Sequence, residues 1–153
     1  MRIPIEPEVY NLIFTESERD GLWPVDLDRR VQNRRGIYLY NKRSVRLPML
    51  SSFDQPDAIT SCPVRPVSTH ALQALSLLNS GFMQEVSQAF AERLQQECGR
   101  NRGCQIDSAW RLALSRSPRP PEIRLAQGFF KSGGTLPDFC LALFNRNEFI
   151  YVP

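Results

Sequence analysis

The sequence predicts an all-α fold, an irregular bundle of about five helices with a long proline-rich loop in its first half. In the second half, apolar residues recur at helical spacing, and capping residues, glycines or prolines mark the segment ends. In the first half, short apolar runs are interrupted by prolines. Hydrophobic residues make up 42% of the 153 residues, enough for a core, so we expect a single domain over residues 1–153.

The first half is the less regular part of the chain. Residues 6–14 (EPEVYNLIF) are a short helix candidate, and residues 20–28 (DGLWPVDLD) are expected to form a loop. Residues 36–40 (GIYLY) are five consecutive apolar positions, which fit either a buried strand or a buried helical segment. Residues 54–67 contain three prolines and are predicted to be an ordered, extended loop.

The first helix of the second half is predicted over residues 68–81, with the broad apolar face of a largely buried helix. Ser68 or Thr69 can cap its start. Gln73 and Asn79 lie within it. Because buried amides require hydrogen-bond partners, we expect the neighbouring proline-rich loop to supply them.

Residues 82–98 give the clearest amphipathic helix in the sequence. The predicted outward face carries glutamate and glutamine at positions 85, 88, 92 and 95. The predicted inward stripe consists of Phe82, Val86, Ala89, Phe90 and Leu94.

Three further helices are predicted. The first begins at the cap Asp107 and ends at the prolines of residues 117–121. The next begins near Pro121 and reaches the pair Gly133–Gly134. The last begins at Thr135–Asp138, which resembles a capping box. Its inward residues are expected to be Phe139, Cys140, Leu143 and Phe144.

Four cysteines are present, and two of them, Cys98 and Cys104, flank a turn-like GRNRG segment. They form either a short disulfide, worth roughly 2 kcal/mol by the chain-entropy estimate, or two free thiols in a loop. Cys140 falls in an apolar helix and is expected to pack in the core. With no C-x-x-C pair and His70 as the only histidine, we expect no zinc or c-type haem site within this chain.

The net charge of +3 conceals an uneven distribution. Residues 1–28 hold seven acidic residues and two arginines, whereas residues 29–46 hold only basic charges. Without a recognised motif, this modest charge gives no reason to expect a nucleic-acid partner. The basic residues singled out as a candidate cluster are Arg34, Arg35, Arg43 and Arg65.

Two roles are open for this arginine cluster. It could cradle an anion, such as a sulfated or uronic polysaccharide, a phosphate or an acidic partner surface. Alternatively, the arginines pair with carboxylates and latch the loop-rich half onto the helices, and we favour this pairing. The carboxylates available for pairing are Glu16, Glu18, Asp20, Asp26, Asp54 and Asp57.

Asp54 also has two possible roles. It could be a catalytic carboxylate with Asp57 or Glu148 as its partner. An aspartate in a proline-rich turn more often bonds backbone amides or an arginine, and we favour that role. Near the end of the chain, Asn145, Asn147 and Glu148 are expected to bond loop backbone.

Five motifs that follow one another along the chain carry a family resemblance. They are RRGIYLYNKRSVRLPMLSSFDQPD, SCPVRPVSTHALQALSLLNSGF, FAERL, WRLALSRSP and LALFNRNEFIYV. Together they resemble the C-terminal domain of unknown function (planctomycete-specific D1 type) of large exported proteins of planctomycetes and acidobacteria. The resemblance spans roughly residues 20–152. The chain departs from the family pattern at Gly36, Arg119 and Arg146.

The resemblance implies that the chain is the C-terminal part of a larger, exported multidomain protein, located in the periplasm or at the cell surface. It implies no cofactor in this chain, with haem in upstream cytochrome-c-like domains. Expected partners are the upstream domains, a polysaccharide or a redox protein. No signal peptide and no membrane span are expected from the residues given.

The family has no established activity, so the function is an expectation only. We expect a non-catalytic helical module with a binding or assembly role. Alternatively, the chain forms part of an enzyme that acts on polysaccharides. Its site would use Arg34, Arg35, Asp54 and Arg65 and would be completed by residues of upstream domains.

Overall fold

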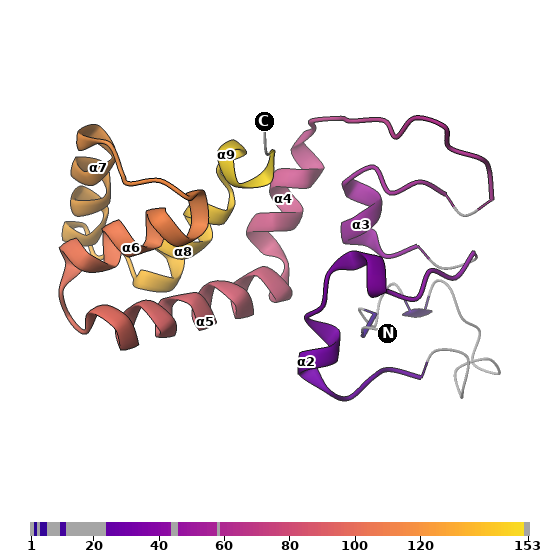
Figure 1. Ribbon diagram of the computed structural model, residues 1–153, viewed down its shortest axis with the longest axis horizontal. Coiled ribbons are helices and arrows are strands. Elements are labelled where there is room, and N and C mark those ends of the chain that lie inside the picture. The colour runs from indigo at the N-terminus through magenta and orange to yellow at the C-terminus, as the bar shows by residue number, and fades with distance from the viewer. Residues whose placement is uncertain are drawn as a thin grey trace. The chain divides into compact units, whose positions relative to one another are not determined.

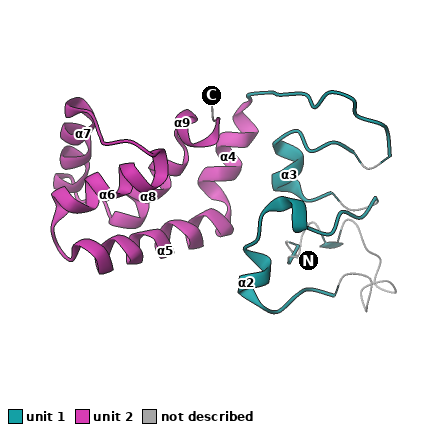
Figure 2. Cartoon of the chain, viewed as in Figure 1, with its two compact units in different colours: residues 1–69 teal, residues 70–153 magenta. Residues whose placement is uncertain are grey.

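The structure is a computed structural model that describes residues 2, 4–5, 10–11, 24–43, 46–57 and 59–151. It is all-α, as predicted: the described residues form helices and no strand. Contacts group the chain into two compact units, residues 1–69 and residues 70–153, which Figure 2 shows in teal and magenta. Each unit is described by itself, and the single domain over residues 1–153 stays a prediction.

The first unit has short helices joined by extended segments. Asp28 caps the first of them, because its side chain accepts a hydrogen bond from the Arg30 backbone N–H at 2.8 Å. A proline occupies the first position of the last one, where the missing N–H costs nothing. The described helices of this unit are α2 (Arg29–Gln32), the 3-10 helix η2 (Gly36–Tyr38) and α3 (Pro48–Ser52).

The prediction that residues 36–40 are a buried segment is wrong. Residues 36–38 form the 3-10 helix η2, and Ile37 and Tyr38 are 85% and 59% exposed. Five apolar residues suffice for burial only where another element packs over them, and Leu47 is the only buried residue in the described part of this unit. Of the predicted helix at 6–14, only residues 10–11 are described, and both are helical; residues 20–23 lie outside the described part.

The second unit is a bundle in which α8 contacts all of the other described helices of the unit (Figure 1). Its chain order places α8 last among the long helices, so the central element comes from near the end of the sequence. The helices are α4 (Ala71–Asn79), α5 (Gly81–Cys98), α6 (Arg102–Leu114), α7 (Pro120–Lys131), α8 (Leu136–Phe144) and α9 (Asn147–Ile150).

The core of this unit is apolar and aromatic. Phe139 of α8 packs against Trp110 and Phe130, with ring centroids 5.5 and 5.0 Å apart. Cys140 is buried as predicted, and burial raises the pKa of its thiol to about 12. The buried core residues are Ala91, Leu94, Ile106, Ala109, Trp110, Ala126, Leu136, Phe139, Cys140 and Leu143.

Two predicted helix starts are wrong. His70, not Ser68 or Thr69, is the residue that precedes α4, and no side chain caps it. Helix α6 begins five residues before Asp107, with Asn101 as the cap; its side chain accepts from the Cys104 N–H at 3.1 Å.

The other starts agree with prediction. Helix α7 begins at Pro120, and the Thr135 hydroxyl accepts from the Asp138 N–H to cap α8.

Asp107, the predicted cap of α6, lies inside that helix and pairs with Arg111 at 2.8 Å. Asparagine and aspartate are both good caps, so the sequence alone does not select between positions 101 and 107.

The buried face of α5 is also rotated from the predicted stripe. Phe82 is 49% exposed, whereas Met83, Ser87 and Ala91 are buried together with Leu94. The prediction followed the largest apolar side chains. The small residues Ser87 and Ala91 instead allow close helix packing. The outward positions 85, 88, 92 and 95 are exposed, as predicted.

Candidate functional site

Asp54 joins two ends of the proline-rich loop in the first unit. It follows α3 with φ at 57°, a left-handed conformation that is uncommon for residues other than glycine. Its carboxylate accepts hydrogen bonds from the Ser68 backbone N–H and the Ser68 hydroxyl, both at 2.8 Å. These bonds close the loop between residues 54 and 68 and occupy both carboxylate oxygens.

Arg65 reinforces the same closure from inside the loop. Its guanidinium donates to the Phe53 carbonyl at 2.7 Å and to the Asp54 carbonyl at 3.2 Å. We call Asp54, Arg65 and Ser68 the loop latch. Carboxylate, guanidinium and hydroxyl in the latch are all engaged, which is the arrangement that a structural role requires.

A cavity of about 470 Å³ lies beside the loop latch. Asp54 and Asp57 both line it, and Asp57 accepts hydrogen bonds from the backbone N–H groups of Thr60 and Ile59. The Thr60 backbone bond is the main reason that the pKa of Asp57 lies below its usual value. Arg34, Arg35 and Arg43 do not line this cavity, so the structure does not bring the proposed enzyme site together there.

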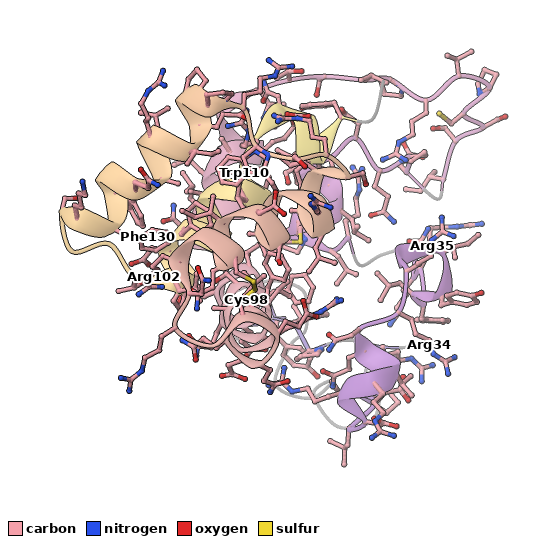
Figure 3. The ribbon with its side chains drawn as sticks, turned by 60° about the vertical axis from the view of Figure 1, so that its left-hand side comes forward. Arg34, Arg35, Cys98, Arg102, Trp110 and Phe130 are labelled. Atoms are coloured by element: carbon pink, nitrogen blue, oxygen red, sulfur yellow. A yellow bond between two sulfur atoms is a disulfide. The ribbon has the colours of Figure 1, made fainter. Side chains whose placement is uncertain are left out.

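The remaining candidate arginines of the first unit are exposed. Arg34 and Arg35 lie between α2 and η2, and Figure 3 shows both at the outer side of this part of the ribbon. No side-chain hydrogen bond or ion pair joins Arg34, Arg35 or Arg43 to another residue of the described part of the chain. With the exposed Ile37 and Tyr38, they form what we call the basic–aromatic segment, residues 34–43.

Glu148, another candidate, belongs to an ion cluster in the second unit. Arg116 donates two hydrogen bonds to Glu122, at 2.7 and 2.8 Å, and two more to Glu148, at 2.5 and 2.8 Å. Arg146 adds a contact to Glu122 at 3.1 Å. The cluster ties α9 to the start of α7, where backbone bonding had been expected for Glu148.

The charges of the ion cluster stabilise one another. Hydrogen bonds from Arg116 are the largest cause that lowers the pKa of Glu122 to about 2, and they also lower the pKa of Glu148. Because each charge is paired and the cluster holds two arginines and two glutamates, we interpret it as a structural clamp rather than a catalytic centre.

The polar candidates on α4 differ in environment. Gln73 is buried, and the Tyr151 hydroxyl donates to its side-chain oxygen at 2.7 Å. Asn79 and Thr69 are exposed. The expectation that a buried amide would find a partner holds for Gln73, but the partner shown comes from the end of the chain, 78 residues away. Asn145 donates to the Leu141 carbonyl of its own helix at 2.8 Å.

A disulfide joins Cys98 and Cys104 where α5 turns into α6 (Figure 3). Gln105, which sequence reasoning did not single out, is buried beside it and donates to the Gly99 carbonyl. Arg102 donates to Gln105 at 2.8 Å and lies over the Phe130 ring, 4.6 Å from its centroid. A glutamine near a turn carries no sequence signal that would have identified this role.

Two kinds of feature are absent from the described residues. No group of three or more histidines, cysteines, aspartates or glutamates within the described ranges could hold a metal ion. Among the helices of those ranges, none combines the length and apolar character needed to cross a membrane.

Comparison with known proteins places the chain in a family. The family model described as PSD1, protein of unknown function (DUF1553), matches residues 5–130. The chain therefore belongs to this family. Neither a curated protein nor a solved structure matches the chain.

Proposed function

We propose that this member of the DUF1553 family is a non-catalytic binding module that docks onto an acidic protein surface through its basic–aromatic segment. The observation that carries this proposal is the exposure of Arg34, Arg35, Ile37 and Tyr38 together on one short segment. The extracytoplasmic setting and the upstream partner domains implied by the resemblance are part of the same proposal.

The state of the loop latch argues against the enzyme alternative. A general acid or nucleophile needs a carboxylate that is free to reach substrate. Both oxygens of Asp54 are bonded to Ser68, and Arg65 is bonded to backbone carbonyls. These groups therefore hold the loop, and Asp57, the other carboxylate that lines the cavity, accepts hydrogen bonds from the backbone N–H groups of Ile59 and Thr60.

The composition of the basic–aromatic segment favours a protein partner. Arginine and tyrosine are among the residues most enriched at interface hot spots, and an exposed aliphatic side chain gains from an apolar pocket. Ile37 is 85% exposed, and a polysaccharide surface offers such a side chain little apolar area. Because residues 29–46 contain no acidic residue, complementarity requires a negative partner.

Selection from a random peptide display library against the immobilised full chain tests this proposal. We expect the selected peptides to combine acidic and apolar residues. The double variant R34A/R35A should weaken their binding by about tenfold, since two exposed charge contacts contribute roughly 0.5–1 kcal/mol each. The variant D54N should leave binding unchanged if the loop remains closed.

The matched control is R100A/R124A, which removes two exposed arginines of the second unit and changes the net charge equally. It should bind the selected peptides like the parent chain. Selected peptides without acidic residues, or equal weakening by both double variants, would refute docking through the basic–aromatic segment. Circular dichroism would verify that each variant is folded.

A further inference from the structure

The Cys98–Cys104 disulfide connects opposite ends of two helices. Cys98 is the last residue of α5, and Cys104 is the third residue of α6. Both residues are half-buried, so their side chains are partly accessible to solvent. The two sulfur atoms therefore share one bond while they lie in different electrostatic environments.

Helix polarity makes that difference directional. The backbone dipoles place partial negative charge at the end of α5, beside Cys98, and partial positive charge at the start of α6, beside Cys104. Within the described part of the chain, the N–H groups of Arg102 and Gly103 have no backbone acceptor. A thiolate at a helix start is stabilised by such groups and by nearby arginines.

A hydroxyl group lies within reach of both sulfurs. The Ser108 oxygen is 3.4 Å from the Cys98 sulfur and 4.0 Å from the Cys104 sulfur. A serine hydroxyl can donate to a sulfur that becomes negatively charged. The Ser108 hydroxyl lies nearer the Cys98 sulfur in the closed disulfide, and it can turn to a thiolate on Cys104, one helical turn before it in α6, when the disulfide opens.

The charge around the disulfide is positive. Arg100 is exposed in the connecting turn, and Arg102 begins α6. Glu97, the acid nearest along the chain, is engaged with Arg93 at 2.8 Å. An anionic reactant is therefore favoured over a cationic one.

We propose that this disulfide is a thiol-exchange site for a small anionic thiol, which attacks Cys98 while Cys104 leaves. The incoming thiolate forms a new S–S bond to the Cys98 sulfur as the Cys98–Cys104 bond breaks. The bonding electron pair passes to the Cys104 sulfur, which becomes the thiolate at the start of α6. The better-stabilised thiolate is the better leaving group, which sets the direction of attack.

A second thiol completes a two-electron reduction. It attacks the mixed disulfide and releases Cys98 as a thiolate, which takes up a proton. The small thiol is oxidised to its own disulfide, and the two cysteines of the chain are reduced. Reduction at this position removes the covalent link between Cys98 of α5 and Cys104 of α6 and leaves the apolar core between the helices in place.

Glutathione serves as the probe in the first experiment. The full chain carries Cys62→Ser, because Cys62 is an exposed free thiol, whereas Cys140 is buried. After brief exposure to glutathione and acid quenching, peptide mass spectrometry locates the mixed disulfide. We expect the glutathione on Cys98. Ser108→Ala should slow the exchange by about threefold to tenfold, the factor that one hydrogen bond of typical net strength contributes.

The single-cysteine variants C98S and C104S provide an independent readout. The pH dependence of iodoacetamide alkylation reports the thiolate fraction of the one remaining cysteine at this site. We expect the midpoint for Cys104 to lie about one pH unit or more below the ordinary thiol value of about 8.5. The midpoint for Cys98 should not be lowered.

Several results would overturn the proposal. Glutathione found on Cys104, equal alkylation midpoints for the two cysteines, or a disulfide that resists glutathione in the folded chain but reacts after unfolding would each do so. Circular dichroism of C98S and C104S verifies that loss of the disulfide leaves the helices formed. If those variants unfold, the position of glutathione on the intact chain and the exchange rate of the Ser108→Ala variant still test the proposal.

Discussion

Replacing Glu122 by glutamine tests the ion cluster of the second unit. The Glu122 side chain is only 12% exposed and accepts hydrogen bonds from Arg116, Arg146 and the Arg119 backbone N–H. Glutamine keeps the shape and one acceptor oxygen but removes the negative charge. The two arginines then remain close together with Glu148 as the only negatively charged group in the cluster.

The size of the effect follows from the pKa of Glu122. Hydrogen bonds from Arg116 are the main cause that lowers this pKa from 4.5 to about 2. Because a pKa difference of one corresponds to about 1.4 kcal/mol, the charge of Glu122 contributes at most about 3 kcal/mol to the free energy of unfolding. Glu148 is 39% exposed, and solvent screens the cluster, so we expect about 1–2 kcal/mol. Because the folded-state pKa lies below the unfolded one, this stability is present above pH 4.5 and is lost as pH falls toward 2.

Thermal unfolding of the parent chain and Glu122→Gln, followed by circular dichroism from neutral to acidic pH, measures this stability. We expect the variant to unfold several degrees lower at neutral pH and the gap to close as the pH falls toward about 2. Glu97→Gln is the matched control, since the Arg93–Glu97 pair is exposed and contributes little. A gap that persists unchanged at acidic pH, or a Glu122→Gln variant as stable as the control at neutral pH, would refute the reasoning.

Two further changes test local packing. A Cβ atom at Gly134 would lie 2.3 Å from the Phe129 ring, so Gly134→Ala should destabilise the second unit by about 1–3 kcal/mol in urea unfolding. Gly128→Ala, inside α7 with open space around it, should instead stabilise by about 0.5–1 kcal/mol, and equal effects of the two would contradict this account. Ser68→Ala removes the hydroxyl bond to Asp54 and should speed protease cleavage within residues 59–66; an unchanged cleavage rate would count against the loop latch.

The helical half was predictable because its signals are local. The proline start of α7, the threonine cap of α8 and the outward polar face of α5 depend on neighbours a few residues apart. The orientation of α5 was not predictable, because Ser87 is buried by the approach of another helix rather than by its own hydrophobicity. Sequence periodicity shows which residues share one face of a helix. It does not show which face packs most closely against a neighbouring helix.

The candidate site was predicted in part. Asp54, Arg65 and Ser68 were candidates from the sequence, and the structure brings them together as a loop closure. No rule of residue spacing specifies which donor in this loop bonds to which acceptor. The partners of Glu148 and Gln73 were missed because they lie 32 and 78 residues away along the chain. Contacts at such separations depend on the assembled bundle.

The central position of α8 has a consequence for the synthesis of this chain. Its residues 136–144 complete the core formed by α5 and α6, yet they are translated after both of those helices. Until they emerge from the ribosome, Leu94, Ile106 and Trp110 have no apolar partner from α8. A nascent chain that ends before residue 136 therefore presents an open apolar face of the kind that chaperones bind, and the second unit closes only after α8 has emerged.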